Sequence, residues 1–336
     1  MIVQLIKKFL APVAFALLML TACNRDDGDF EVEIPDFNFP QTHTFQAKLS
    51  SYAIFQGTPS ELVPAEGFEF LELSSVLFSD YAHKQRLVKI PEGTQMTKLS
   101  DGSIDFPEGT ILTKTFFYYN DERDPNLGKR IIETRLLIKE SEVWNVATYV
   151  WNKAQTEASL VMNGLDLPIS WIASSGSNES TVYHVPTKNE CMTCHQSNAS
   201  MSPLGPTLLH LNRDVSRDGS TINQISYLQS LGLMSDFAVD QVETMVDYKD
   251  LGASLEDRAR AYLEMNCAHC HNPNAWSTPA EKNFNFRHDV PFNHTGILSG
   301  KDRIQNNVNN KEMPFIGTTM LDKEGVALLN AYIESL

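Results

Sequence analysis

The chain has no excess of basic residues and no long low-complexity segment. Its 336 residues include 27 Lys and Arg against 42 Asp and Glu, a formal net charge of −15 at pH 7. Acidic surfaces repel the phosphate backbone, so the composition excludes nucleic acid as a partner. Such a charge suits a basic protein partner attracted over a distance, although it also serves simply to keep a protein soluble.

Long hydrophobic runs are also missing, and the clearest one, Phe9–Leu20, is too short for a comfortable transmembrane helix. It follows Lys7 and Lys8 and ends just before Cys23, an order typical of a secretory signal. The segment Leu20–Cys23 resembles the bacterial lipobox, which implies a lipid-modified Cys23. We therefore expect residues 1–22 to be a signal peptide. The mature chain is then an exported lipoprotein on a bacterial membrane, the outer membrane, facing the periplasm or the cell surface. An ordinary signal with an incidental cysteine is the alternative.

Cysteine is scarce, and its five positions leave none spare for a disulfide if every predicted role is filled. Besides Cys23, the cysteines form two C-x-x-C-H motifs. The motifs are Cys191-Met-Thr-Cys194-His195 and Cys267-Ala-His-Cys270-His271. This spacing lets two thiols bond to the vinyl groups of one haem while the adjacent imidazole ligates its iron. Two copies on an exported chain predict two covalently bound c-type haems, with His195 and His271 as proximal ligands.

Two other uses of paired cysteines compete with haem. Four thiolates are a common structural zinc site, and C-x-x-C pairs also form redox-active or structural disulfides. The two pairs lie 76 residues apart, which exceeds common zinc-finger spacings, and zinc needs no histidine after each pair. The sequence therefore favours haem.

Sixth ligands are harder to read from the sequence. Met313 lies 42 residues after His271 and precedes Pro314, which stiffens the loop, so we expect Met313 to ligate the second iron. For the first iron we predict Met234, 39 residues after His195. Other sixth ligands of the first iron stay open, and these are Met201, His210 and Met245. An open or water-bound sixth position is a further alternative. His269, inside the second motif, is expected to be a surface residue or to lie behind the ligands.

The rest of the chain divides by composition. Residues 23–44 are acidic and predict a flexible tether. Residues 45–186 carry short β-branched and aromatic segments between turn signals, which predicts an antiparallel sandwich or barrel. The expected strands are 68–73, 86–90, 111–119, 131–139, 143–151 and 181–185.

Residues 187–250 form the first haem segment, with a helix expected over 221–228. Residues 251–336 place a capping box at Ser254, the second motif, Met313 and a closing helix capped by Asp322 in that order. This order resembles a class I cytochrome c domain. The predicted fold class is thus multidomain, an N-terminal antiparallel β sandwich or barrel-like domain followed by a mainly α cytochrome c-type haem region.

Several short segments carry a wider resemblance. Residues 260–273 around the second motif, with segments 77–82, 106–110 and 133–137, are similar to a bacterial family of exported dihaem c-type cytochromes without an established role. The resemblance implies two covalent haems and electron transfer, and no defined substrate. The Phe106-Pro107-Glu108-Gly109-Thr110 segment is also similar to β-sheet cytochromes that bind nitric oxide or oxidise hydroxylamine. That likeness implies an open distal face on the first haem.

The expected function is a lipid-anchored dihaem c-type cytochrome that carries out electron transfer with a redox partner protein, a basic one given the charge. The alternative is a dihaem oxidoreductase with peroxidase-like or small nitrogen-ligand chemistry at an open first haem, although dihaem peroxidases usually place their motifs farther apart. A third hypothesis is a binding module whose β domain recognises glycan or protein. The sequence names no small-molecule substrate.

Overall fold

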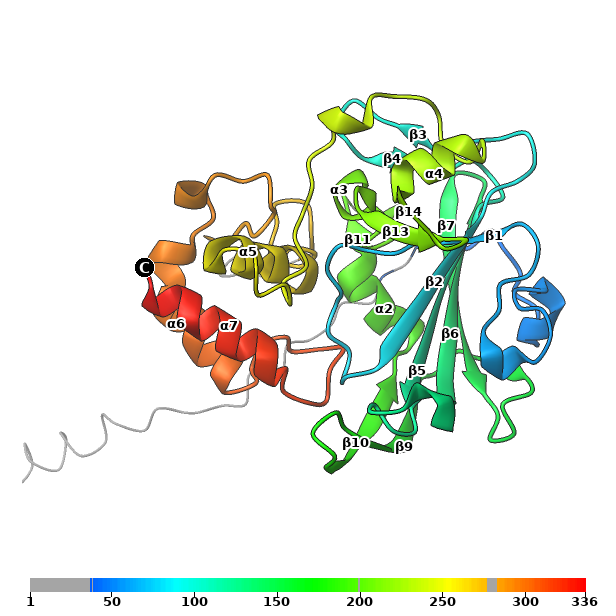
Figure 1. Cartoon of the computed structure of the whole chain (residues 1–336), viewed down its shortest axis with the longest axis horizontal. Helices are drawn as coiled ribbons and strands as arrows, with labels where there is room; N and C mark the ends of the chain where they lie inside the picture. The colour runs from blue at the N-terminus through cyan, green and yellow to red at the C-terminus, as the bar shows by residue number, and fades with distance from the viewer. Residues whose placement is uncertain (1–36, 38, 199, 277–282) are drawn as a thin grey trace, which may run out of the picture. The chain divides into compact units, whose positions relative to one another are not determined.

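A six-stranded antiparallel sheet is the largest element of the structure, a computed structural model that describes residues 37, 39–198, 200–276 and 283–336 (Figure 1). The sheet is open, with β1 and β8 as its edges and the order β1-β2-β5-β6-β7-β8. Its strands are β1 (Phe68–Phe70), β2 (His83–Lys89), β5 (Ile111–Tyr119), β6 (Lys129–Glu140), β7 (Val143–Trp151) and β8 (Ala158–Val161).

The two faces of this sheet bury different clusters, because side chains alternate between faces along each strand. On one face Leu87, Leu136 and Tyr149 pack in a cluster with Leu49 of the 3₁₀ turn η1 (Leu49–Tyr52) and with Leu62, which follows the turn η2 (Pro59–Glu61). We call the opposite face the haem-motif face. It carries Val88, Leu112, Leu137 and Val146 on adjacent strands, and these belong to one apolar cluster with Met192 of the first C-x-x-C-H motif.

Four two-stranded hairpins accompany the sheet. They are β3 (Thr97–Lys98) with β4 (Ile104–Asp105), β9 (Leu165–Ile172) with β10 (Asn178–Val185), β11 (Gln196–Ser197) with β12 (Ser200–Met201), and β13 (Asp214–Arg217) with β14 (Ser220–Asn223). The β9–β10 hairpin contributes Trp171 and Tyr183 to a cluster with Phe116 and Tyr118 of β5.

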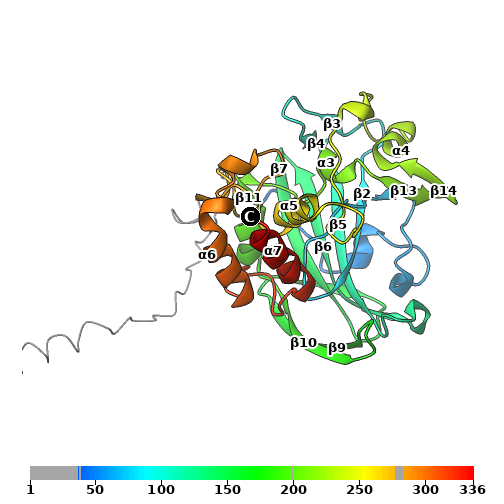
Figure 2. The same cartoon turned by 60° about the vertical axis from the view of Figure 1, so that its left-hand side comes forward.

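The described helices are α2 (Lys188–His195), α3 (Leu208–Leu211), α4 (Gln224–Ser230), α5 (Leu255–Asn266), α6 (Ile297–Asn309) and α7 (Lys323–Glu334), and 3₁₀ turns η3 (Pro125–Leu127), η4 (Val239–Gln241) and η6 (Phe292–His294) accompany them. Ser254 caps α5 and Asp322 caps α7, as the sequence predicts. Helices α5 and α6 both contact α7, and all three contribute to one apolar core (Figure 2).

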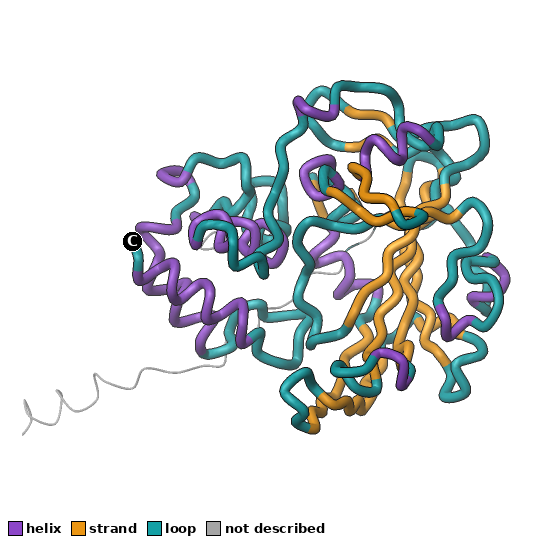
Figure 3. Tube along the Cα trace, in the orientation of Figure 1, coloured by secondary structure: helices purple, strands orange, loops and turns teal. Residues whose placement is uncertain are grey.

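The predicted fold class was wrong. The structure is mostly β-sheet with few helices (Figure 3), and the region expected to be mainly α is not, because its helices alternate with loops and with the β11–β12 and β13–β14 hairpins. Residues 187–250 add two hairpins and only short helices. The β-rich part is one open sheet with two hairpins, β3–β4 and β9–β10, and the described strands form no closed barrel.

One local signal accounts for part of the error. Asp218 and Gly219 have φ values of 51° and 77°, and this Asp-Gly pair forms the tight turn of the β13–β14 hairpin. The expected helix over 221–228 consequently begins only after Asn223, whose side chain accepts from the N–H groups of Ile225 and Ser226. By contrast, β5 and β7 have the predicted bounds.

The predicted signal peptide and Cys23 lie outside the described residues, as does most of the tether. None of the helices that the structure describes has both the length and the apolar content needed to cross a membrane. Contacts group residues 36–336 into one compact unit, and the domain boundaries at 186 and 250 stay predictions.

Candidate functional site

Helix α2 presents the whole first motif from its final turns. Thr187 and Glu190 form a reciprocal capping box that starts the helix, and His195 ends it. Cys191 is buried, and this burial raises the pKa of its thiol to about 11. Both Cys191 and Cys194 are free thiols.

His195 is held in an orientation that suits a metal ligand. Its Nδ1 donates to the carbonyl oxygen of Ser202 at 2.9 Å. Since a carbonyl only accepts, the proton lies on Nδ1 and the lone pair of Nε2 is available to a metal ion. Burial is the main cause that lowers the pKa of His195 to about 4, so the ring is neutral as ligation requires.

The second motif follows α5 directly. Cys267 caps the helix through its N–H, which donates to Leu263, and the N–H groups of Cys270 and His271 both bond to the carbonyl of Cys267. The His271 ring lies 5.8 Å from that of Phe284 and 5.2 Å from that of Phe286, measured between centroids. These aromatic rings wall one side of the predicted proximal histidine.

A largely apolar pocket adjoins this second motif. It is lined by motif residues Cys267, Cys270 and His271 together with Met313 and Pro314. Apolar side chains make up much of the remaining lining, and these are Leu77, Phe78, Val308, Phe315, Ile316, Met320, Leu321, Val326 and Leu329. The polar side chains of the lining include Lys311, Thr318 and Asp322. Apolar walls with a few convergent polar groups are typical of cofactor sites. The structure thus brings Met313 to the pocket of His271, a relation that the spacing predicts.

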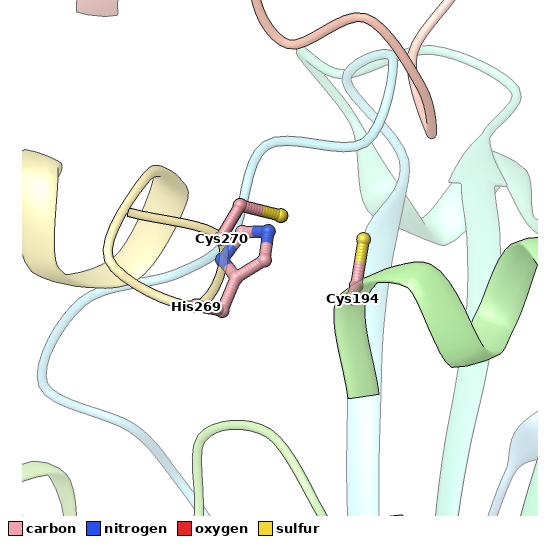
Figure 4. Close-up of side chains that lie close together, drawn as sticks. All are labelled: Cys194, His269 and Cys270. Atoms are coloured by element: carbon pink, nitrogen blue, oxygen red, sulfur yellow. The ribbon is translucent and has the colours of Figure 1, made fainter. Parts of the chain in front are cut away.

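The two motifs meet in space, although 76 residues separate them in the sequence. The sulfurs of Cys194 and Cys270 and a ring nitrogen of His269 all lie within 4.8 Å of one another (Figure 4). A hydrogen bond with the Cys270 thiol, followed by contacts with His269, holds the pKa of Cys194 well below its usual value against the opposing effect of burial. Cys194 also lines the pocket of the second motif.

His269, expected at the surface or behind the ligands, is the motif residue whose position is hardest to predict from the sequence. Its half-buried side chain lies beside Cys270, with a ring nitrogen within 4.8 Å of the Cys194 sulfur of the other motif. No pattern in the sequence relates residue 269 to residue 194, because only the packing of α2 near the end of α5 brings them together.

The candidates for the first sixth ligand are all buried. Met234 and Met201 belong to the apolar cluster of the haem-motif face, together with Met192 of the motif. Met245 belongs to the core of α5 and α7. His210 has a buried Nδ1 without a hydrogen-bond partner in the described structure, and burial lowers its pKa to about 4.

Sequence reasoning missed the charged residues on the sheet beside α2. The carboxylate of Glu133 is fully buried and accepts from Arg135 Nε at 3.0 Å and from the Tyr183 hydroxyl at 2.6 Å. Glu133 and Arg135 both affect the pKa of the Cys191 thiol, so they lie near the first motif. Charged residues at inward positions of otherwise apolar strands were the available signal.

Comparison of the chain with protein-family models, with curated proteins and with solved structures gave no match.

The donor set fits the predicted cofactor. Each motif offers two unbridged thiols with an imidazole next to the second, the His195 ring is neutral and oriented, and an apolar pocket with a thioether stands at the second motif. The buried, unpartnered Nδ1 of His210 is a further group that a ligand would satisfy.

Proposed function

We propose that the chain is an electron-transfer protein that holds two covalent c-type haems, one on each C-x-x-C-H motif. The observation that carries the proposal is the meeting of the two motifs at Cys194 and Cys270, within 4.8 Å. Electron transfer between two centres is fast only over short distances, so motifs that touch suit a pair of centres working in series. The pocket with Met313 supports the assignment at the second motif.

In this proposal the motif residues and Met313 each have a distinct role. Cys191 and Cys194 hold one group, Cys267 and Cys270 hold the other, and His195 and His271 supply the proximal imidazoles. Met313 supplies a thioether at the second site. A bound c-type haem supplies a one-electron couple whose potential depends on its axial ligands and burial. The carbonyl of Ser202 fixes the ring of His195, which keeps its Nε2 aimed at one position.

Location and partner form part of the same proposal. The order of Lys7, the apolar run and Cys23 supports an exported lipoprotein anchored to a bacterial outer membrane, facing the periplasm or the cell surface. The net charge of −15 favours a basic redox partner protein, since opposite charges speed encounter.

The decisive experiment counts haems on the pure protein. The full chain is produced in a host with the cytochrome c attachment machinery and analysed by intact mass and pyridine haemochrome spectra. We expect two haems, and loss of one in each double variant, C191S/C194S or C267S/C270S. Bare thiols in the unmodified chain would refute the proposal.

A second candidate function, zinc binding, depends on Cys194, His269 and Cys270. Two thiols and an imidazole that converge within 4.8 Å are also the donor set of a zinc site with an open fourth position. Thioether bonds would commit both sulfurs, so the two functions exclude each other. Zinc measured at one equivalent per chain, lost on His269→Ala and without haem absorbance, would establish the metal site instead.

A further inference from the structure

Three cationic side chains form a row across the haem-motif face of the sheet. The register pairs Arg86 of β2 with Lys114 of β5, and Lys114 with Arg135 of β6. Directly paired residues of antiparallel strands point to the same face, with Cβ atoms about 5 Å apart. Lys84 lies two positions before Arg86 and therefore on the same face. Four cations thus share a small patch of half-buried sheet.

Glu133, which the register places on this face, does not balance that charge, and Asp322 and Asp80 act on Lys84. Glu133 binds Arg135 and Tyr183, so its single negative charge is already used. The structure shows no ion pair for Lys84, Arg86 or Lys114 within its described residues. The ammonium of Lys84 donates to the carbonyl of Ala82, and that of Lys114 lies 4.9 Å from the centroid of Phe116.

Such an arrangement costs stability unless something compensates it. Like charges directly opposite each other on a sheet repel, and half-buried charges lose part of their hydration. The pKa values report the same strain. Burial, followed by Arg86, Arg135 and Lys84, lowers the pKa of Lys114 well below its usual value. Burial, followed by Arg86 and Lys249, likewise lowers the pKa of Lys84 to about 7, against the opposing effect of Asp322 and Asp80.

The row lies beside the first motif. Lys114 and Arg135 are near enough to His195 to add to the lowering of its pKa, after burial. Arg86 does the same at His210, the buried histidine with a free Nδ1. Next along the same face come Val88, Leu112 and Leu137, which pack in one cluster with Met192 of α2. Any group held by His195 would therefore sit close to these cations.

We propose that Arg86, Lys114 and Arg135 form an anion-binding site for a carboxylate or small oxyanion beside the first C-x-x-C-H motif. The proposal extends the proposed function, since the carboxylate has two sources: a propionate of the prosthetic group on that motif, or a free anionic ligand. Arginine forks and a lysine ammonium bind such oxygens well, and an anion would offset the mutual repulsion of the row.

The test compares the full-length holoprotein with Lys114→Gln and Arg86→Gln. Lys153→Gln, at an exposed turn position, is the matched control. Calorimetric titration with inorganic phosphate and with acetate measures binding of a free anion. Redox titration of each variant measures the midpoint potential of each haem. The C267S/C270S chain, which lacks the attachment cysteines of the second motif, shows which potential belongs to the first haem.

Two results support the site and tell its sources apart. If the anion is free, phosphate or acetate binds saturably, raises the melting temperature, and loses affinity about tenfold in Lys114→Gln but not in Lys153→Gln. If the anion is a propionate, neither probe binds, and Lys114→Gln and Arg86→Gln shift the potential of the first haem alone while both haems stay attached.

The site is refuted if folded Lys114→Gln and Arg86→Gln change neither anion affinity nor the first potential. Absence of haem from the pure protein would contradict the proposed function. It would not decide the anion site, because phosphate titration can still be carried out on a chain without haem. In that chain, phosphate binding lost in Lys114→Gln supports the site, and no binding refutes it.

Discussion

The carboxylate of Asp80 binds the backbone N–H and the hydroxyl of Thr319, each at 2.8 Å, across 239 positions of sequence. It also accepts from the N–H of Met320 at 2.8 Å. Asp80 is buried just before β2, and its carbonyl accepts from the Tyr118 hydroxyl. Asp80 therefore holds the loop that carries Met313 against the sheet, a few residues after Met313, the predicted iron ligand.

Replacing Asp80 by alanine should destabilise the protein by about 3 kcal/mol, because three half-buried donors lose a buried charged acceptor. Urea unfolding measures the change. Asp101→Ala is the control, since Asp101 lies in an exposed turn and accepts from Ser103, two residues along the chain, and this variant should stay within about 0.5 kcal/mol. Equal effects of the two variants would contradict the fastening role of Asp80.

If the chain holds the two haems that we propose, Met313→Ala should lower the midpoint potential of the second haem only, by a clear part of the roughly 0.8 V that axial ligands span. The reason is that Met313 lines the pocket of His271, and a thioether ligand favours reduced iron. Redox titration with magnetic circular dichroism follows the ligand. Met162→Ala, at a methionine that is 44% exposed, should change neither signal. An unaltered spectrum in Met313→Ala would remove it from the ligand set.

His184 should make stability depend on pH. Burial lowers its pKa, but the carboxylates of Asp166 at 2.6 Å and Glu190 at 3.1 Å outweigh this, and the net pKa is raised above 6.5. A raised pKa in the folded state stabilises fully below the unfolded value and is lost as pH rises through the folded value. The stability gap between the wild type and His184→Gln should thus be largest near pH 6 and shrink at higher pH.

Urea unfolding of both proteins between pH 6 and 9 checks this dependence. His294→Gln, at an exposed histidine for which the described structure contains no ion pair, is the control. A gap that grows with rising pH would overturn the assigned direction.

Leu136→Ala should cost about 2–5 kcal/mol, because Leu136 is fully buried in the central strand β6 and its loss leaves a cavity. Leu127→Ala, at a leucine that is 60% exposed in the turn η3, should cost far less. Chemical unfolding of both variants distinguishes them. A small loss at Leu136 would mean that the sheet core repacks freely.

Local features were readable from the sequence because each depends on residues close to one another in the chain. The bounds of β5 and β7 follow from their runs of β-branched and aromatic residues, and the caps at Ser254 and Asp322 follow from one polar oxygen before a helix. The β13–β14 hairpin is just as local, but the weak helical period of residues 221–228 competes with the signal of its Asp218–Gly219 turn.

By itself the sequence determined the chemistry that each C-x-x-C-H motif can perform, since two thiols and an imidazole at fixed spacing need no distant partner. Tertiary structure alone decided which of these groups meet. The register of three strands aligns Arg86, Lys114 and Arg135, and the packing of α2 near the end of α5 brings Cys194 to Cys270. A slip of one residue would turn the row to the opposite face, so no local pattern can specify it.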